Sequence, residues 1–248
     1  MSLKTLVLAG DGLNCEHETA FAIELAGGKA DICHVNSLFE NPKKLLDYAV
    51  LAIPGGFSFG DEVSSGKLLA VKLRLILGDT LQEFIDRDRL VIGICNGFQM
   101  LVKLGLLPVS KQGQQQMTLT HNRQHQFINQ WVTMTTEGNS PFFSDFKANE
   151  KIALPIRHGE GRLVLPIGSD GSELLPHIAL QYTRDVNGSF NTIAGLSNTK
   201  GNVLGLMPHP EGFVRWTQHP TWTSLSASEK EETPVGLRIF KNMIEAAK

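Results

Sequence analysis

The segment from residue 90 to residue 104 constrains the fold more than any other part of the chain. An apolar run, Leu-Val-Ile (90–92), leads into Gly-Ile-Cys-Asn-Gly (93–97) and then into the helix-forming Met-Leu-Val-Lys-Leu (100–104). A strand that ends in Gly-x-Cys-x-Gly and turns sharply into a helix is a nucleophile elbow with sulfur in place of a hydroxyl. The glycines stand where a side chain would collide with backbone, and a helix N-terminus favours thiolate over thiol. We therefore expect Cys95 to be a nucleophile, and the alternative is a buried structural cysteine.

The segment Met-Pro-His-Pro-Glu (207–211) supplies a base and a group to orient it. Its prolines bias the residues before them away from the helical region, so the segment should be extended. Residues two apart then point to the same side, which lets the Glu211 carboxylate accept a hydrogen bond from one ring nitrogen of His209. The other nitrogen can face Cys95, as nucleophilic catalysis requires. The alternative is a simple loop histidine, because only the fold can bring these two segments together.

A glycine pair follows the apolar strand at 49–52, in Ile-Pro-Gly-Gly (53–56). Glycine peptides can turn their N–H groups toward a ligand, which is the geometry that an oxyanion hole requires. Taken alone, Pro-Gly-Gly indicates only a turn. Beside an elbow nucleophile, we favour the oxyanion hole.

These segments together resemble the class I (triad) glutamine amidotransferases, and in particular the glutaminase component of phosphoribosylformylglycinamidine synthase. The resemblance runs from about residue 5 to about residue 215, and it is carried by 10–16, 54–61, Asn122 with Phe127, 158–162, 187–189 and 201–211. It implies that Cys95 is the nucleophile, His209 the base and Glu211 its orienter. It also implies an oxyanion hole and substrate-binding site that contains Gly55, Gly56, Phe57, Asn96 and Gln99, with the backbone N–H groups of Gly56 and Asn96 as the oxyanion donors.

The activity implied by this resemblance is hydrolysis of L-glutamine to glutamate and ammonia. The ammonia would pass to a synthase subunit that makes formylglycinamidine ribonucleotide in de novo purine biosynthesis, and a small accessory subunit can join the complex. No cofactor is expected in this chain, since it has no phosphate-binding loop followed by Lys-Ser/Thr, and ATP and Mg²⁺ are expected on the partner synthase subunit. The alternatives are a glutaminase subunit of another amidotransferase, a cysteine hydrolase or peptidase, and a non-catalytic regulatory or binding module on the same fold.

Several positions need separate interpretation. Four residues depart from the pattern of the family and are expected at contacts with the synthase rather than with glutamine: Phe59, Arg157, Val186 and Gly212. His158, close to Glu160, could form a second catalytic pair, but its glycine neighbours favour a contact loop near the synthase interface or the glutamine pocket. His121 and His125 lack a third ligand, so we expect surface residues rather than a metal site.

Composition limits the class of protein. A chain of 248 residues with 42% hydrophobic residues can form one α/β domain, so we expect a single domain over 1–248, with a C-terminal extension from about residue 216. A net charge of −2 gives no reason to expect nucleic acid or an anionic membrane as partner. We expect neither a signal peptide nor a membrane-spanning segment, because Met-Ser-Leu-Lys (1–4) leads directly into a strand and no apolar run is long enough to span a bilayer. Its three cysteines show no metal-ligand spacing, which is typical of a reduced, cytoplasmic protein.

The order of elements predicts an α/β fold with a mostly parallel central sheet flanked by helices, which is flavodoxin-like in the resembling family, and an antiparallel extension. Strands are expected at 6–8, 30–35, 49–53 and 90–94, and helices at 18–26, 43–47, 68–77 and 81–85. After residue 105 we expect a polar loop at 111–116, strands that extend the sheet at 127–135, 151–156, 162–165, 178–182, 192–196 and 203–207, and a final helix after Thr233-Pro234. Active residues then belong at the carboxyl ends of the parallel strands.

Overall fold

A central sheet of nine strands forms the body of the computed structural model, which describes residues 4–10, 12–58, 66–108, 114–137 and 140–248. The strands run in the order β2-β1-β3-β4-β11-β10-β9-β6-β7. Their bounds are β1 Lys4–Ala9, β2 Lys29–His34, β3 Val50–Ile53, β4 Leu90–Ile94, β6 Ile128–Thr136, β7 Lys151–His158, β9 Ile178–Tyr182, β10 Ile193–Ser197 and β11 Val203–Leu206. The predicted α/β class with a mixed sheet is confirmed.

One half of this sheet is parallel. Strand β1 lies between β2 and β3, β4 pairs with β3, and β11 pairs with the other edge of β4, all in the same direction. Each of β1, β3, β4 and β11 is almost completely buried, as expected for strands covered by helices on both faces. Because the four strands are adjacent and parallel, the loops that follow them meet at one edge.

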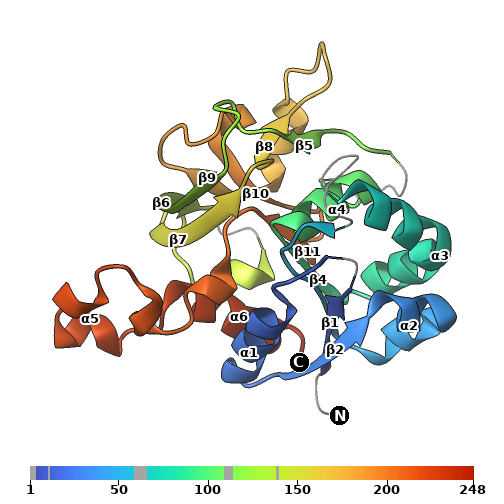
Figure 1. The fold of residues 1–248 in the computed structure, drawn as a ribbon, viewed down its shortest axis with the longest axis horizontal. Coiled ribbons are helices and arrows are strands. Elements are labelled where there is room, and N and C mark those ends of the chain that lie inside the picture. The colour runs from blue at the N-terminus through green and yellow to red at the C-terminus, as the bar shows by residue number, and fades with distance from the viewer. Residues whose placement is uncertain (1–3, 11, 59–65, 109–113, 138–139) are drawn as a thin grey trace.

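Helices cover both faces of the parallel half (Figure 1). The helix α1 (Glu16–Leu25) packs on the C-terminal helix α6 (Val235–Ala246), and α3 (Lys67–Asp86) packs on α4 (Asn96–Leu104) across the sheet from them. Short helices α2 (Val35–Glu40) and α5 (Ala227–Glu231) complete the set of α-helices in the described part of the chain. No helix in that part is both long enough and apolar enough to span a bilayer.

The other half of the sheet is antiparallel, as the strand-like runs after residue 105 predict. Strand β10 pairs with β11 and β9, and β6 lies between β9 and β7. The expectation that every run extends the main sheet is wrong for β8 (Arg162–Val164), which pairs with β5 (Thr118–Thr120) in a separate two-stranded sheet. Strand β5 is too short for its pattern to predict it, because three residues show no periodicity.

The helices differ from the expected ranges in three places. The structure has one continuous helix, α3, where two were expected, and Gly78 lies buried within it. Packing of one face, which includes Leu69, Leu73 and Leu77, outweighs the low helix propensity of glycine. The run 43–47 is a 3₁₀ helix, Pro42–Asp47, and α2 was not expected at all.

The segment after residue 216 packs against the rest of the molecule at its two ends, near Trp216 and through α6, whereas most residues between 220 and 232 are exposed. Trp131 and Phe213 stack edge to face at 5.1 Å between ring centroids, and Phe213 and Trp216 do so at 5.2 Å. The Trp216 indole N–H donates to the carbonyl of Glu232 at 2.8 Å. The α6 helix that follows buries Ile239, Phe240 and other apolar side chains.

Candidate active site

The candidate residues converge because their strands are neighbours in the sheet. The loop after β1 carries Cys15, the loop after β3 carries Gly55 and Gly56, β4 ends directly before Cys95, and β11 ends shortly before His209. Four segments that are far apart in the sequence therefore meet at the carboxyl edge of the parallel strands. This is the edge where such sheets place their ligands.

Cys95 lies in a strained turn between β4 and α4. Its backbone has φ 52° and ψ −103°, which few residues other than glycine adopt. A Cβ at Gly97 would lie 2.0 Å from the carbonyl oxygen of Ile53, and one at Gly93 would lie 2.7 Å from the carbonyl oxygen of Gly97. Both glycines are thus required by the close approach of backbone, as expected for an elbow. The Cys95 thiol is buried and lies 3.6 Å from the carbonyl oxygen of Arg157.

His209 and Glu211 form a buried pair. The imidazole Nδ1 lies 2.5 Å from Glu211 Oε1, and both side chains are at most 5% exposed. The backbone N–H of His209 donates to the carbonyl of Pro155 on β7 at 2.9 Å, which fixes the loop against the antiparallel half of the sheet. His209 Nε2 has no hydrogen-bond partner among the residues that the structure describes. The carboxylate therefore fixes the ring and leaves the second nitrogen available.

Electrostatics keep His209 protonated. Burial lowers the pKa of His209, but the negative charges of Glu211 and Cys95 raise it, and the net result lies well above the usual 6.5. The Tyr182 side chain is fully buried near the same centre, where burial and the charge of Cys95 raise its pKa. A proton held on His209 at neutral pH is what a departing amine requires.

The glycine loop presents a backbone donor. Asn14 and Cys15 donate their N–H groups to the carbonyl of Gly55 at 3.2 Å, and Phe57 donates to the carbonyl of Gly12 at 2.9 Å. Gly56 lies opposite Leu13 between these bonds, in a non-hydrogen-bonded pair, so its own N–H points away from the 12–15 segment. A Cβ at Gly56 would lie 2.6 Å from the carbonyl oxygen of Gly12, so only glycine fits there.

Two adjoining hollows surround Cys95. One, of about 320 Å³, is lined by Cys95, Gly56, Phe57, Gln99 and His158 among others, and one of about 250 Å³ is lined by Cys95, Cys15 and His209 among others. Gln99 is buried, accepts a hydrogen bond from the Asn96 side chain at 2.9 Å and donates to the carbonyl of Glu160 at 2.6 Å. All eight residues expected at the site thus lie around one centre.

Two of the departures from the family pattern lie close to this centre. Arg157, expected among contacts to a partner, lines both hollows and offers its carbonyl to Cys95. A Cβ at Gly212 would lie 2.9 Å from Pro155 Cγ, so glycine suits the close packing there. Val186 is buried, and Phe59 lies outside the described residues. The sequence offered no local signal for Arg157, because its place depends on the pairing of β7 with β6.

Cys15 is a site residue that sequence reasoning did not identify. It caps the N-terminus of α1, and its Sγ would lie 3.4 Å from a Cβ at Gly55, beside His209 Cε1 and Cys95 Cβ. Donor atoms of Cys15, His209 and Glu211 lie within 4.8 Å of one another, and these are donor types that zinc accepts. The 2.5 Å contact between Nδ1 and Oε1 is a hydrogen bond, however, and leaves no room for an ion between those two atoms.

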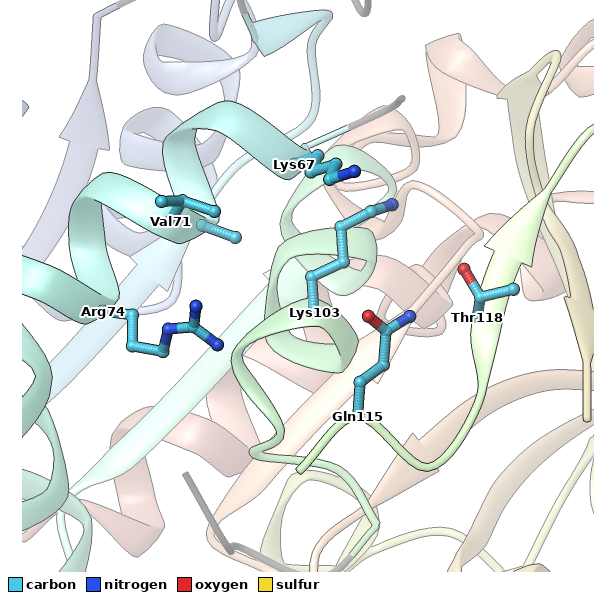
Figure 2. A pocket seen from close by; sticks show the side chains of 7 residues that line it. Lys67, Val71, Arg74, Lys103, Gln115 and Thr118 are labelled. Carbon is cyan, nitrogen blue, oxygen red and sulfur yellow. The ribbon is translucent and has the colours of Figure 1, made fainter. Parts of the chain in front are cut away.

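A separate basic hollow lies between α3 and α4 (Figure 2). Its volume is about 330 Å³, and its lining includes Lys67, Arg74, Lys103, Gln115 and Thr118. The side chains of Lys67 and Lys103 extend toward the same space from the two helices. None of the lining residues belongs to the centre around Cys95. Its charge suits an anion, not an acyl-transfer reaction.

Comparison with known proteins identifies the family. Residues 2–245 match the CobB/CobQ-like glutamine amidotransferase domain. The chain is 36% identical to phosphoribosylformylglycinamidine synthase subunit PurQ of Dehalococcoides mccartyi, over 99% of this chain and 98% of that protein, and 39% identical to PurQ of Treponema denticola, over 97% of each. The solved structure of PurLQS from Thermotoga maritima matches with a TM-score of 0.78 and 32% identity over all of both chains. The protein therefore belongs to the CobB/CobQ-like glutamine amidotransferase family, and the two relatives named here are PurQ subunits.

Proposed function

We propose that this glutamine amidotransferase is the glutaminase subunit of a phosphoribosylformylglycinamidine synthase, with Cys95, His209 and Glu211 as its triad. One observation carries the assignment of the triad. Cys95, in its strained turn, lines the same hollow as His209, and Nδ1 of His209 is hydrogen-bonded to the buried carboxylate of Glu211. The full-length similarity to PurQ subunits supports the choice of synthase.

The reaction begins when Cys95 Sγ attacks the side-chain amide carbon of L-glutamine. The oxygen of that amide gains negative charge, and the N–H groups of Gly56 and Asn96 stabilise it. His209 then delivers its proton to the nitrogen, which leaves as ammonia, and a thioester remains on Cys95. Glu211 keeps the imidazole oriented and stabilises its positive charge. Water hydrolyses the thioester and releases glutamate.

The ammonia passes to a synthase subunit that uses ATP and Mg²⁺ to form formylglycinamidine ribonucleotide. This chain itself requires no cofactor for the hydrolysis, because thiol, imidazole and backbone donors supply every proton transfer and charge contact. The PurLQS complex of the Thermotoga maritima relative supports a partnership with PurL-type and PurS-type subunits.

A cysteine substitution tests the assignment. Cys95→Ala should abolish glutamine-dependent synthesis in the reconstituted complex but leave synthesis from added ammonium, because only the source of ammonia is removed. It should also prevent covalent labelling by 6-diazo-5-oxo-norleucine. Cys33→Ala is the matched control, since Cys33 is also a buried cysteine but lies on β2 and should still allow labelling. Equal labelling of wild type and Cys95→Ala would exclude Cys95 as the nucleophile.

A further inference from the structure

His158 is a second buried histidine at the candidate site. It ends β7, directly after Arg157, whose carbonyl oxygen lies 3.6 Å from the Cys95 thiol. Its side chain is only 2% exposed, and it lines the hollow that contains Cys95 and Gln99. The triad proposed above does not use it.

The hydrogen bonds around His158 determine which ring nitrogen carries the proton. Asn122 donates its side-chain N–H groups to the carbonyls of Gln126 at 2.9 Å and His158 at 2.8 Å, so the amide orientation is fixed. Asn122 Oδ1 can then only accept, and it lies 3.0 Å from His158 Nδ1 and 3.2 Å from the backbone N of Gly161. His158 Nδ1 must therefore be the protonated nitrogen, and Nε2 of the neutral ring carries a bare lone pair.

The ring of His158 is fixed and uncharged. A Cβ at Gly161 would lie 2.4 Å from both Nδ1 and Cε1, so the 161 backbone packs directly against the ring. Burial, together with the positive charge of His209, lowers the pKa of His158 to about 4. Within the part of the chain that the structure describes, Nε2 is buried and has no hydrogen-bond partner. A fixed, buried acceptor calls for a donor, which a ligand in the adjoining hollow can supply.

Glutamine offers such a donor at the reacting group. Its amide oxygen is taken by the oxyanion donors, so the amide nitrogen, with its N–H bonds, remains for an acceptor. We propose that His158 is a catalytic residue that accepts, through Nε2, a hydrogen bond from the amide nitrogen of glutamine as that nitrogen leaves. This assignment rests on the glutaminase function proposed above.

The step balances without a proton transfer to His158. The bond between Cys95 Sγ and the amide carbon forms, the carbon–nitrogen bond breaks, and one proton passes from His209 to the nitrogen. The nitrogen departs as neutral ammonia, which keeps an N–H bond directed at Nε2. The product glutamate has a carboxylate without donors, so this contact favours the substrate over the product.

Two substrates with the same acyl group test the proposal, because only one has an N–H on its leaving group. His158→Phe keeps an aromatic ring but removes the acceptor. It should lower kcat/KM for L-glutamine by about 10-fold or more, as expected for loss of a buried hydrogen bond, while hydrolysis of L-glutamate γ-methyl ester changes by less than about 3-fold. His121→Leu is the matched control, since His121 lines the same hollow but is exposed, and it should leave the ratio of the two activities unchanged.

The possible outcomes separate this proposal from the proposed function. An equal loss on amide and ester would mean a structural role for His158, and no loss on either would mean no role. Absence of Cys95-dependent hydrolysis in the wild type would instead refute the glutaminase function. If His158→Phe fails to fold, ¹⁵N NMR spectra of Cys95→Ala protein with labelled histidine provide the test. The resonance of His158 Nε2 should shift when glutamine binds and should not shift when the ester binds. The same Nε2 resonance with glutamine and with the ester would refute the proposal.

Discussion

At the scale of single residues, the site depends on buried polar groups whose partners are supplied by chain segments far apart in the sequence. His209 is held by Glu211 two residues away, which is a local pairing, whereas His158 is held by Asn122 from a different segment. Both rings are fixed through Nδ1, and both present Nε2. Burial and charge then give them opposite protonation states, because Glu211 and Cys95 favour the cation at His209, whereas burial and the charge of His209 favour the neutral ring at His158. Two histidines in one site can thus serve as donor and acceptor.

Substitutions at the base and its orienter should have different effects. His209→Ala removes the proton carrier and should lower kcat for glutamine by about 100- to 10,000-fold. Glu211→Gln keeps a hydrogen-bonding group but no longer stabilises the imidazolium, so its loss should be no greater. Steady-state glutaminase assays measure both, and ammonium-dependent synthesis by the complex serves as the control. Unchanged activity in folded His209→Ala would rule out this triad.

The pKa of His158 gives the stability a dependence on pH. A folded-state pKa of about 4, against 6.5 for an unperturbed histidine, means that the unfolded chain binds a proton that the native state excludes. The resulting contribution to the free energy of unfolding is fully present above pH 6.5 and is lost as the pH falls toward 4. Between about pH 7.5 and about pH 5, wild type should therefore lose about 2 kcal/mol more unfolding free energy than His158→Gln. Urea unfolding at both values measures this difference, and parallel losses would contradict it.

At the scale of elements, the elbow between β4 and α4 can form because glycines stand where its backbone packs closely against itself and against the end of β3. The backbone of Gly97 nearly touches the carbonyl of Ile53, so the turn, the parallel pairing and the glycine loop are geometrically linked. The sequence predicted the elbow itself correctly, since its strand, its glycine-flanked cysteine and its helix follow one another directly in the chain, whereas the contact with Ile53 depends on the fold. It did not predict that α3 is continuous or that β8 leaves the main sheet, because those outcomes depend on packing partners elsewhere.

A single methyl group at the elbow should disrupt this unit. Gly97→Ala places a Cβ 2.0 Å from a backbone oxygen that cannot move away, and it should destabilise the protein by about 1–3 kcal/mol or more. Gly159→Ala is a matched control near the same centre, because its nearest neighbour, Phe127 Cδ2, is 3.9 Å away, and it should change stability by less than about 0.5 kcal/mol. Thermal or urea unfolding compares the two. Similar stability of both variants would show that the elbow tolerates a side chain.

At the scale of the whole molecule, we expect a partner to control the site. A free glutaminase would waste glutamine, so coupling requires that the oxyanion donors be in place only when the synthase is bound and loaded. The Gly55–Gly56 peptide is the expected movable part, and in this structure it is bonded to the 12–15 segment, which would have to move with it. A partner acts by stabilising the competent conformation.

We therefore expect the isolated chain to hydrolyse glutamine slowly. Its cognate synthase, with ATP and substrate, should raise the rate by about 100- to 1000-fold, the usual effect of one oxyanion donor. A steady-state assay of the chain alone and then in the complex measures the change. Lys67→Glu is a control in the basic hollow, away from the centre, and should leave the activity of the isolated chain unaltered. Full activity without the synthase would contradict the coupling.

The sequence by itself determined the elements whose physical requirements are local: the elbow around Cys95, the His209–Glu211 pair, the glycine loop and the parallel α/β half of the sheet. Glycines on either side of a cysteine, prolines that extend a segment and apolar strands are all patterns of a few consecutive residues, so they can be recognised without a fold. Only the tertiary structure decided that Cys15, Arg157 and His158 belong to the same site. These residues come from the loop after β1 and the end of β7, and they reach Cys95 through pairing between strands far apart in the chain. No local pattern records such pairing, because it depends on which strand edges and helix faces the whole chain can bury together.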